Sequence, residues 1–586
     1  MTNIKSYTPA MKNRVAQVLG DSHVLNQHEY EYIPAHIVNT RGVGAYGLFQ
    51  LYESQSEFTK ADFLQNPDVS TSVFVHFSSV ADARGVIDSL RGFAVRFYTK
   101  EGHFDLVGNN IPVAFAQGKP PVLAPVPHQD THYELPQTAS AQDVFWNGIT
   151  RSPESTHAIM WAMSDRAIPR SVAMMQGFGG HTFRFTNEQG KSCLAKFHWK
   201  PLMGTYSLVW DEAVKLASKD ADFHRRQLWE LIDRGHYPEW ELGVQILAEE
   251  DQHKFNFDVL DPTKLIPESL VPVRIIGKLR LNRNPENYCA ETDPVAFYSG
   301  HLVPGIDVAI ADSSEAESAA SAGAMVEDHY SQAGLFWRSQ SVWEQEHIVS
   351  AFCFALAKVS VPAIRVRMLA NLTQVDIALA QQVAKGLGME LPAATDSAAH
   401  LPDAGLPATD PSLSLVNNSD EFIVGRCVAV LVAEGFESER LLALKESLAI
   451  GGASLKIIAS HLGDVKSKEG RKFQVDYCLS TVGSVMFDAV FVPGGHLSVE
   501  ALCKEANAVL FVKEAYKHGK AIGASDEGGM LFTRAARSSI LSDRFKGPGV
   551  ISAPFGSDSV VFVQQFISAL ARHRFFERSD LAGIVA

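Results

Sequence analysis

The sequence predicts an α+β protein made of an antiparallel β-barrel, a helical segment and a C-terminal α/β domain. Residues 34–308 contain β-branched and aromatic runs between glycine-rich or charged turns, as in 73–78 (VFVHFS) and 93–99 (FAVRFYT). Residues 344–388 place apolar side chains at helical spacing. From residue 425 onwards, buried-strand runs alternate with helical stretches, which is typical of a doubly wound parallel sheet.

Length and composition limit the classes of function. A chain of 586 residues exceeds what one hydrophobic core usually serves, so two or three domains are expected. The net charge of -14, without a basic run, argues against nucleic-acid or anionic-membrane partners. No apolar stretch is long enough to span a bilayer, and the first residues lack the apolar region of a secretory signal. Six cysteines without a C-x-x-C pair predict neither a metal site nor a disulfide framework, and favour the cytoplasm.

Two helices follow from the apolar spacing of residues 344–388. The first begins after the acidic residue Glu344, and the second ends at 386–388 (GLG), a plausible glycine C-cap. Their expected core positions are Ile348, Phe352, Leu356 and Val359 in the first helix, and Met368, Leu372, Val375, Leu379 and Val383 in the second.

Residues 33–47 (IPAHIVNTRGVGAYG) closely resemble the signature of haem catalases. The likeness continues through 91–99 (RGFAVRFYT), 107–112 (VGNNIP), 164–171 (SDRAIPRS), 196–201 (KFHWKP), 281–288 (LNRNPENY) and 302–306 (LVPGI). The chain is therefore identified as a divergent member of the large-subunit haem catalases. This resemblance implies an antiparallel eight-stranded β-barrel over residues 33–311, preceded by a shortened N-terminal arm at 1–32.

Two groups that haem catalysis requires in this family are missing. Asn39 stands where the family has its distal histidine, and an amide cannot accept and return a proton near neutral pH. The Arg-x-Phe-x-Tyr motif, whose tyrosine is the axial ligand of haem iron in the family, occurs nowhere in the chain. A short polar bridge at 312–327 takes the place of the family's wrapping segment, and the likeness resumes in a helical domain at 328–389.

The C-terminal third carries a second resemblance. Residues 390–424 include four prolines and read as an exposed interdomain linker. Residues 425–586 look like the flavodoxin-like domain, related to class I glutamine amidotransferases, that closes large-subunit catalases. At the position of the nucleophile elbow this chain has 521–526 (AIGASD). Because no base that could activate Ser525 is identifiable, we expect a structural elbow.

The resemblance also assigns parts of a former haem pocket. Ser78 matches the serine that hydrogen-bonds the distal histidine, and Asn109 matches the asparagine that orients peroxide. Val38 and Phe115 match apolar residues that line the channel. Asn39, Ser78 and Asn109 are interpreted as a vestigial distal pocket, although ordinary polar positions of a barrel would look the same. Val38 and Phe115, with His36 and His76, are interpreted as the former haem cradle.

His36 and His76 match the arginines that neutralise the haem propionates. Imidazoles are mostly uncharged at neutral pH and lack the bidentate fork of arginine. We therefore expect no haem. The two histidines would suit a replacement metal site, but a pocket released from haem needs no metal, and none is expected.

A lateral nicotinamide pocket is a further family feature, found on the barrel exterior of small-subunit catalases. His157, Ser164, Arg166 and Lys200 align with its polar contacts. The stacking Trp-Pro-His of the family is matched by 263–265 (TKL). For that reason we do not expect NADPH to be retained.

Three interpretations remain open. The chain is a haem-free pseudoenzyme of the catalase family, or its emptied barrel cavity binds or transforms a small molecule, or it is a working haem catalase with unusual ligation that converts hydrogen peroxide to water and oxygen. A homo-oligomer, dimer or tetramer, is expected, because relatives bury apolar barrel surface between subunits.

Overall fold

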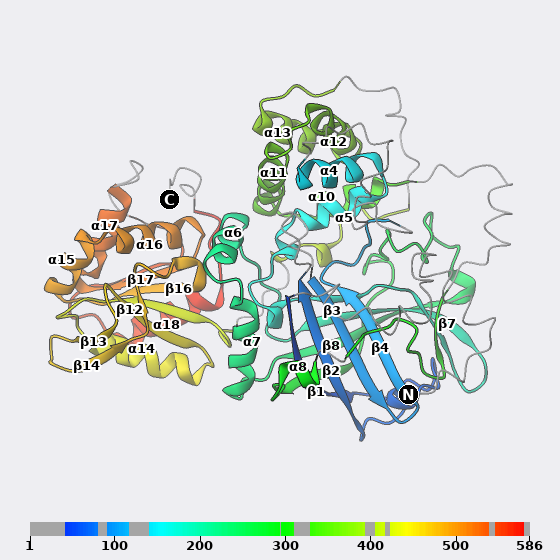
Figure 1. The fold of residues 1–586 in the computed structure, drawn as a ribbon, viewed down its shortest axis with the longest axis horizontal. Helices are drawn as coiled ribbons and strands as arrows, with labels where there is room; N and C mark the ends of the chain where they lie inside the picture. Colours follow the sequence, from blue (N-terminus) through cyan, green and yellow to red (C-terminus); the bar gives the residue numbers. More distant parts are fainter. Residues whose placement is uncertain are drawn as a thin grey trace. The chain divides into compact units, whose positions relative to one another are not determined.

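The chain folds into two compact units (Figure 1). The computed structural model describes residues 41–79, 91–116, 140–292, 295–309, 328–392, 405–416, 422–537, 545 and 547–578. The first unit draws on Met1–Ser207 and Tyr237–Asn418, and the second on Leu208–His236 and Ser419–Ala586. Residues 208–236, which the sequence analysis placed in the barrel domain, thus fold with the C-terminal domain. None of the described helices is both long and apolar enough to cross a membrane.

Eight strands of the first unit form a closed antiparallel barrel. They pair in the circular order β1-β2-β3-β4-β5-β7-β8-β9, and the pairing of β9 with β1 completes the circle. Their bounds are β1 (Arg41–Leu51), β2 (Ser70–Ser79), β3 (Arg91–Thr99), β4 (Gly102–Asn109), β5 (Gly177–Gly179), β7 (Ser192–Pro201), β8 (Glu239–Ala248) and β9 (Arg274–Arg283). Two short strands, β6 (Phe183–Thr186) and β10 (Ile306–Val308), extend the sheet beyond β7. The predicted eight-stranded barrel is confirmed.

The interior of the barrel is packed with aromatic side chains. Alternate residues of each strand point inward, and many of these are large. The ring of Phe93 lies 4.8 Å from Phe77, 5.6 Å from Trp240 and 5.9 Å from Trp199, measured between centroids. All four side chains are at most 2% exposed. In the described part of the chain, these side chains fill the barrel interior. The expected small-molecule site in the emptied pocket stays a prediction, because His36, Val38 and Asn39 lie outside the described residues.

Among the described residues, six helices of eight or more residues accompany the barrel in the first unit. They are α4 (Ala141–Arg151), α5 (Ser155–Ala162), α10 (Ser331–Ser339), α11 (Val342–Ala357), α12 (Pro362–Val375) and α13 (Ile377–Leu387). Helix α11 begins with a capping box in which the Ser341 N–H and hydroxyl both donate to the carboxylate of Glu344, at 2.8 and 2.7 Å. Helix α13 ends at Gly388, whose φ of 64° is the left-handed conformation that glycine favours. All nine predicted core positions are buried. The predicted second helix is wrong as a single element, because it divides into α12 and α13 at Asp376, and Val359 follows the end of α11.

The second unit contains a six-stranded parallel sheet in the order β15-β12-β11-β16-β17-β18. The strands are β11 (Cys427–Leu431), β12 (Ser454–Ala459), β15 (Tyr477–Cys478), β16 (Ala489–Val492), β17 (Ala521–Ser525) and β18 (Val550–Ala553). The helices are α14 (Glu439–Ile450), α15 (His496–Lys504), α16 (Ala506–Lys517), α17 (Gly529–Arg537) and α18 (Ser559–Ala571). One apolar core lies between the sheet and α14 and α18, and a second between the sheet and α15 to α17 (Figure 1). The predicted doubly wound α/β domain is confirmed.

Two helices from the middle of the chain belong to this second unit. They are α6 (Trp210–Lys219) and α7 (Phe223–Asp233). Leu208 and Leu216 pack against Val485, which precedes β16. The sequence between β7 and β8 of the barrel therefore supplies part of the C-terminal unit.

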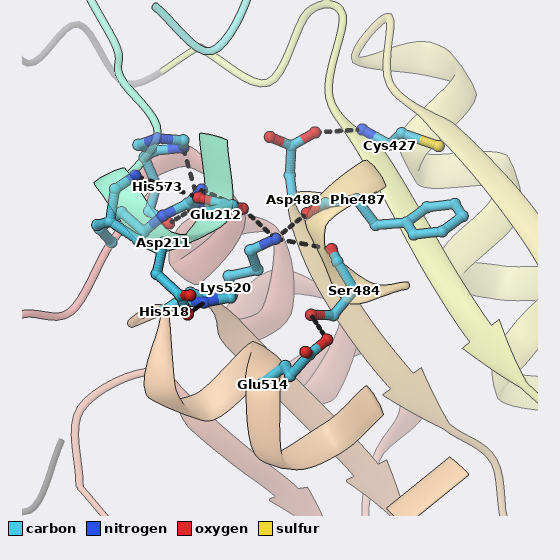
Figure 2. Close-up of polar contacts among 12 residues, drawn as sticks. Asp211, Glu212, Cys427, Ser484, Phe487, Asp488, Glu514, His518, Lys520 and His573 are labelled. Atoms are coloured by element: carbon cyan, nitrogen blue, oxygen red, sulfur yellow. Dashed lines mark hydrogen bonds and ion pairs between the residues drawn. The ribbon is translucent and has the colours of Figure 1, made fainter. Parts of the chain in front are cut away.

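A buried polar network attaches α6 to this unit (Figure 2). Glu212 and Lys520 are both 0% exposed and form an ion pair. The Lys520 Nζ also donates to the carbonyls of Ser484 and Phe487, each at 2.7 Å. Arg574 Nη2 donates to Glu212 Oε2 at 2.9 Å. Burial alone would raise the pKa of Glu212, but the charges of Arg574 and Lys520 hold it down, at about 2.

Candidate functional site

The polar residues of the former distal pocket lie on the outer face of the barrel. Phe77 of β2 points into the aromatic core, so its neighbours His76 and Ser78 point outward. Cross-strand pairing places Ser78, Gly92 and Asn109 in one row over β2, β3 and β4. Ser78 and Asn109 are thus two strands apart, roughly 10 Å at the usual strand spacing. The structure brings these two predicted site residues onto one surface.

His76 lies in the next row of this outer face and is 7% exposed. A Cβ built on Gly42 would come within 2.4 Å of the imidazole Nε2, so the ring lies directly over that glycine. The ring centroid of Phe297 is 6.2 Å from that of His76. Burial lowers the pKa of His76 to about 4, and the imidazole is therefore neutral at pH 7, as expected from the sequence.

A charged cluster on β3 and β4 holds a later segment of the chain against this outer face. Arg96 Nε and Nη2 donate to the two carboxylate oxygens of Asp105 at 2.7 and 2.6 Å. Arg96 Nη2 also donates to the Ala296 carbonyl at 2.6 Å, and Asp105 accepts from the Tyr298 N–H at 3.0 Å. Asp105 and His301 Nδ1 are 2.8 Å apart. This cluster was not predicted from the sequence. The feature that could have indicated it is a charged residue at an outward position of each strand.

The other residues predicted for the former haem site are Asn39 of the distal pocket and His36, Val38 and Phe115 of the haem cradle. His36, Val38 and Asn39 lie outside the described residues. The Phe115 carbonyl accepts a hydrogen bond of 2.6 Å from Ser155 Oγ, and its side chain is half-buried.

A cavity of about 210 Å³ lies on the outer face of β7 and β8. Lys196, His198 and Lys200 recur every second residue along β7, and therefore face the cavity from one side of the strand. Arg166 and Glu268 line it from other segments of the same unit. We call this cavity the lateral pocket; its charged and polar lining comprises Arg166, Gln176, Lys196, His198, Lys200, Gln245, Glu268 and Ser412.

The four residues predicted for a lateral nicotinamide pocket divide into two pairs around this cavity. Arg166 and Lys200 line it. His157 and Ser164 do not, but both hold Trp161, which does. Trp161 Nε1 donates to His157 Nε2 at 3.1 Å, and Ser164 Oγ donates to the Trp161 carbonyl at 2.7 Å. Burial lowers the pKa of His157 to about 3, so this ring is neutral and can accept.

Cationic side chains outnumber carboxylates in the lining of the lateral pocket. Burial lowers the pKa of Arg166 to about 10 and that of Lys196 to about 8. Burial also lowers the pKa of His198 to about 4 and raises that of Glu268. Exclusion of water disfavours the charged form of each group, which lowers the pKa of a base and raises the pKa of an acid. Such a pocket favours an anionic ligand, because a negative charge would offset the desolvated cations.

The guanidinium of Arg166 retains an unused donor. Its Nη1 donates to Gln176 Oε1, and its Nη2 donates to the Ser412 carbonyl at 2.7 Å. The buried Nε has no hydrogen-bond partner among the described residues. A buried donor without a partner is costly, and it marks a place where a ligand oxygen would be stabilised.

Part of the predicted linker closes the lateral pocket. Asp410 and Leu413 are 2% and 5% exposed, whereas the composition of residues 390–424 predicted exposure. Asp410 Oδ1 accepts from the Ser412 N–H at 3.0 Å, and its Oδ2 accepts from Ser269 Oγ at 3.0 Å. These contacts bury a polar turn that the sequence predicts to be an exposed linker.

Comparison with known proteins accounts for this barrel and its accompanying domains. The family model described as "Catalase" matches residues 4–312, and models described as "Catalase-related immune-responsive" and "C-terminal domain found in long catalases" match 325–387 and 424–580. Catalase-2 of Bacillus subtilis is 40% identical, over 94% of this chain and 90% of the relative. Catalase HPII of Mycobacterium avium is 39% identical over the same shares, and Catalase-B of Dictyostelium discoideum is 35% identical over 95% and 91%. The chain belongs to the catalase family.

The comparison also shows a difference in length. The alignment with Catalase-2 extends over 638 residues, although the chain has only 586. Catalase-2 therefore carries residues without a counterpart in this chain.

At the elbow of the long-catalase C-terminal domain, Ser525 contacts the backbone of a neighbouring turn. Ser525, the last residue of β17, accepts a hydrogen bond of 3.0 Å from the Gly494 N–H through its Oγ. The residue with positive φ, 51°, is Asp526, which pairs with Arg440 at 2.5 Å. The strained position of the turn is thus one residue later than the serine that the sequence singled out.

Proposed function

We propose that this catalase-family protein holds no haem, does not dismute hydrogen peroxide, and binds a small anionic molecule in the lateral pocket. The observation that carries the first part is the absence of any Arg-x-Phe-x-Tyr motif in the chain. Haem iron is held in proteins by an axial side chain, and the family's tyrosine has no replacement that the sequence reveals.

The described residues of the former cradle do not suit haem. His76, in place of a propionate-binding arginine, is neutral and lies over Gly42. A neutral imidazole offers a propionate neither a charge nor two parallel N–H donors. Asn39, in place of the distal histidine, supplies no base. Each change removes a separate interaction with the cofactor or with peroxide, so their joint presence supports loss of the whole reaction.

The lateral pocket supports the second part of the proposal. Buried Arg166 and half-buried Lys196 face a single lining carboxylate, that of Glu268. Its volume of about 210 Å³ is below the roughly 300–1,000 Å³ of pockets for drug-sized ligands. A molecule smaller than a dinucleotide therefore fits best, and we do not propose NADPH.

An absorbance spectrum of the full chain, produced in cells supplied with a haem precursor, tests the loss of haem. We expect no Soret band and no oxygen evolution from peroxide. Catalase-2 of Bacillus subtilis, produced in the same way, is the control. Stoichiometric haem together with oxygen evolution would overturn the proposal in favour of a working haem catalase, the function that the relatives' names favour.

Thermal unfolding in the presence of pyruvate, a small carboxylate, tests ligand binding. A ligand that binds only the folded state raises the unfolding temperature with concentration. We expect this rise in the wild type and in Arg184→Met, which removes a surface ion pair with Glu249, but not in Arg166→Met. Equal rises in all three proteins would exclude the lateral pocket as the binding site.

The same proposal extends to assembly and location. The five described cysteines, 193, 353, 427, 478 and 503, are all free thiols, which supports a reducing cytoplasm. Membership of the catalase family supports a homo-oligomeric assembly for this chain, and we propose a dimer or tetramer.

A further inference from the structure

The lateral pocket contains a half-buried lysine whose amine is held by a backbone carbonyl. The Lys196 Nζ donates to the carbonyl of Lys264 at 3.2 Å, and the charges of Asp261 and Asp258 act on it without an ion pair among the described residues. Burial lowers the pKa of Lys196 to about 8, so much of the amine is neutral just above neutral pH. A neutral amine in a water-poor pocket is nucleophilic toward carbonyl carbon.

Two other lining groups complement this amine. The Arg166 guanidinium is buried, is charged at neutral pH and has an unpartnered Nε, which suits a carboxylate oxygen. Burial raises the pKa of Glu268, so its carboxyl group can hold a proton closer to neutral pH than an exposed glutamate. An amine, a carboxylate-binding guanidinium and a proton-carrying acid thus share one cavity.

We propose that Lys196 captures a short 2-oxo acid as an imine in the lateral pocket. The inference rests on the proposed function, because it names the class of ligand for the same pocket. The volume suits the class: an engineered cavity of about 150 Å³ holds benzene, so about 210 Å³ accommodates a ligand with a few more atoms than pyruvate.

The reaction balances without any further reactant. The lone pair of the Lys196 nitrogen forms a bond to the 2-oxo carbon, and the carbonyl π electrons move to the oxygen. The nitrogen passes one proton to this oxygen, which completes the carbinolamine. The hydroxyl group then takes a second proton from Glu268 and leaves as water, and the iminium nitrogen returns its remaining proton to the Glu268 carboxylate. The product is the imine of Lys196, and the carboxylate of the ligand pairs with Arg166. No atom is oxidised or reduced.

A purely structural role for Lys196 would produce no covalent product. In that case, Lys196 would only satisfy the Lys264 carbonyl, and substitution would affect stability alone. Trapping of the imine separates the two roles, because borohydride reduces an imine to a stable secondary amine.

The experiment treats the full chain with pyruvate, then with sodium borohydride, and measures intact mass followed by peptide mapping. We expect one reduced adduct per chain, located at Lys196, in a yield that rises between pH 7 and pH 9. The proposal would be overturned if, in the wild type, surface lysines were labelled and Lys196 remained unmodified.

Matched variants test the role of each group. Lys196→Arg keeps the charge but cannot form an imine, and should lose the adduct. Lys254→Arg alters a surface lysine outside the pocket, whose Nζ lies 3.9 Å from Asp251, and should keep it. Arg166→Met should reduce labelling by pyruvate at least tenfold but leave labelling by acetaldehyde, which has no carboxylate, within about twofold. Equal labelling of Lys196→Arg and wild type would overturn the assignment.

The outcomes distinguish this inference from the proposed function. Stabilisation by pyruvate that depends on Arg166, without an adduct at Lys196, would refute imine formation and leave the binding function intact. A Soret band with oxygen evolution would refute the haem-free function, while an adduct at Lys196 would still support the inference.

Discussion

Replacement of Lys520 by methionine is the change with the largest expected effect on the second unit. Methionine has a similar length but cannot donate a hydrogen bond, so Glu212 would keep only Arg574 as a cationic partner. The Phe487 carbonyl would lose the Lys520 donor, and the Ser484 carbonyl would keep only the Phe487 N–H. Removal of one partner of a buried ion pair costs about 3–5 kcal/mol.

Hydrogen exchange measured by mass spectrometry reports this loss where it occurs. Peptides from residues 208–236 carry α6 and α7, which Glu212 attaches to the sheet. A loss of about 3 kcal/mol in the free energy of local opening corresponds to exchange roughly a hundredfold faster, since each 1.4 kcal/mol is about tenfold. Lys215→Met is the matched control: it removes partly exposed ion pairs with Asp211 and Glu514, which contribute at most about 1 kcal/mol.

Similar exchange rates in Lys520→Met and Lys215→Met would refute the reasoning. Such a result would mean that apolar contacts, as between Leu216 and Val485, are sufficient to hold α6 in place.

Three further predictions concern the barrel unit and the assembly. The pKa of His76 is about 4 in the folded state and 6.5 in the unfolded state, so its contribution to the free energy of unfolding is present above pH 6.5 and is lost as the pH falls towards 4. In His76→Gln, the free energy of unfolding should therefore fall by about 3 kcal/mol less between pH 6.5 and pH 4 than in the wild type, as measured by urea unfolding at both pH values. Asn39→His should not restore peroxide dismutation in an oxygen-electrode assay, because a distal base has no function without bound iron; measurable turnover would contradict this. Light scattering at micromolar concentration should give a dimeric or tetrameric mass, and a monomeric mass would disprove the expected assembly.

Strands and helices with a strong periodic pattern were predictable from the sequence. The runs at 73–78 and 93–99 lie within β2 and β3, because β-branched and aromatic residues alternate there. The apolar residues predicted as one face of α11, including Ile348 and Phe352, are buried. Local spacing is sufficient in these cases, since every residue of the pattern belongs to one element.

The site was only partly predictable. Lys196, His198 and Lys200 recur at a period of two, so the sequence could have assigned them to one face of a strand. Glu268 and residues 412–413 come from irregular segments with no periodicity, and the proline-rich composition around 412 predicts exposure. Only the folded chain brings them to the outer face of β7.

By itself, the sequence determined the family, the two kinds of sheet and the loss of the family's distal histidine and tyrosine motif, because each of these depends on which residues occur in which local order. The tertiary structure decided that aromatic rings fill the barrel, that residues 208–236 join the C-terminal unit, and that Arg166, Lys196 and Glu268 share one cavity. The physical reason is that packing, burial and the resulting pKa shifts depend on contacts between residues far apart in the chain, which local patterns do not encode.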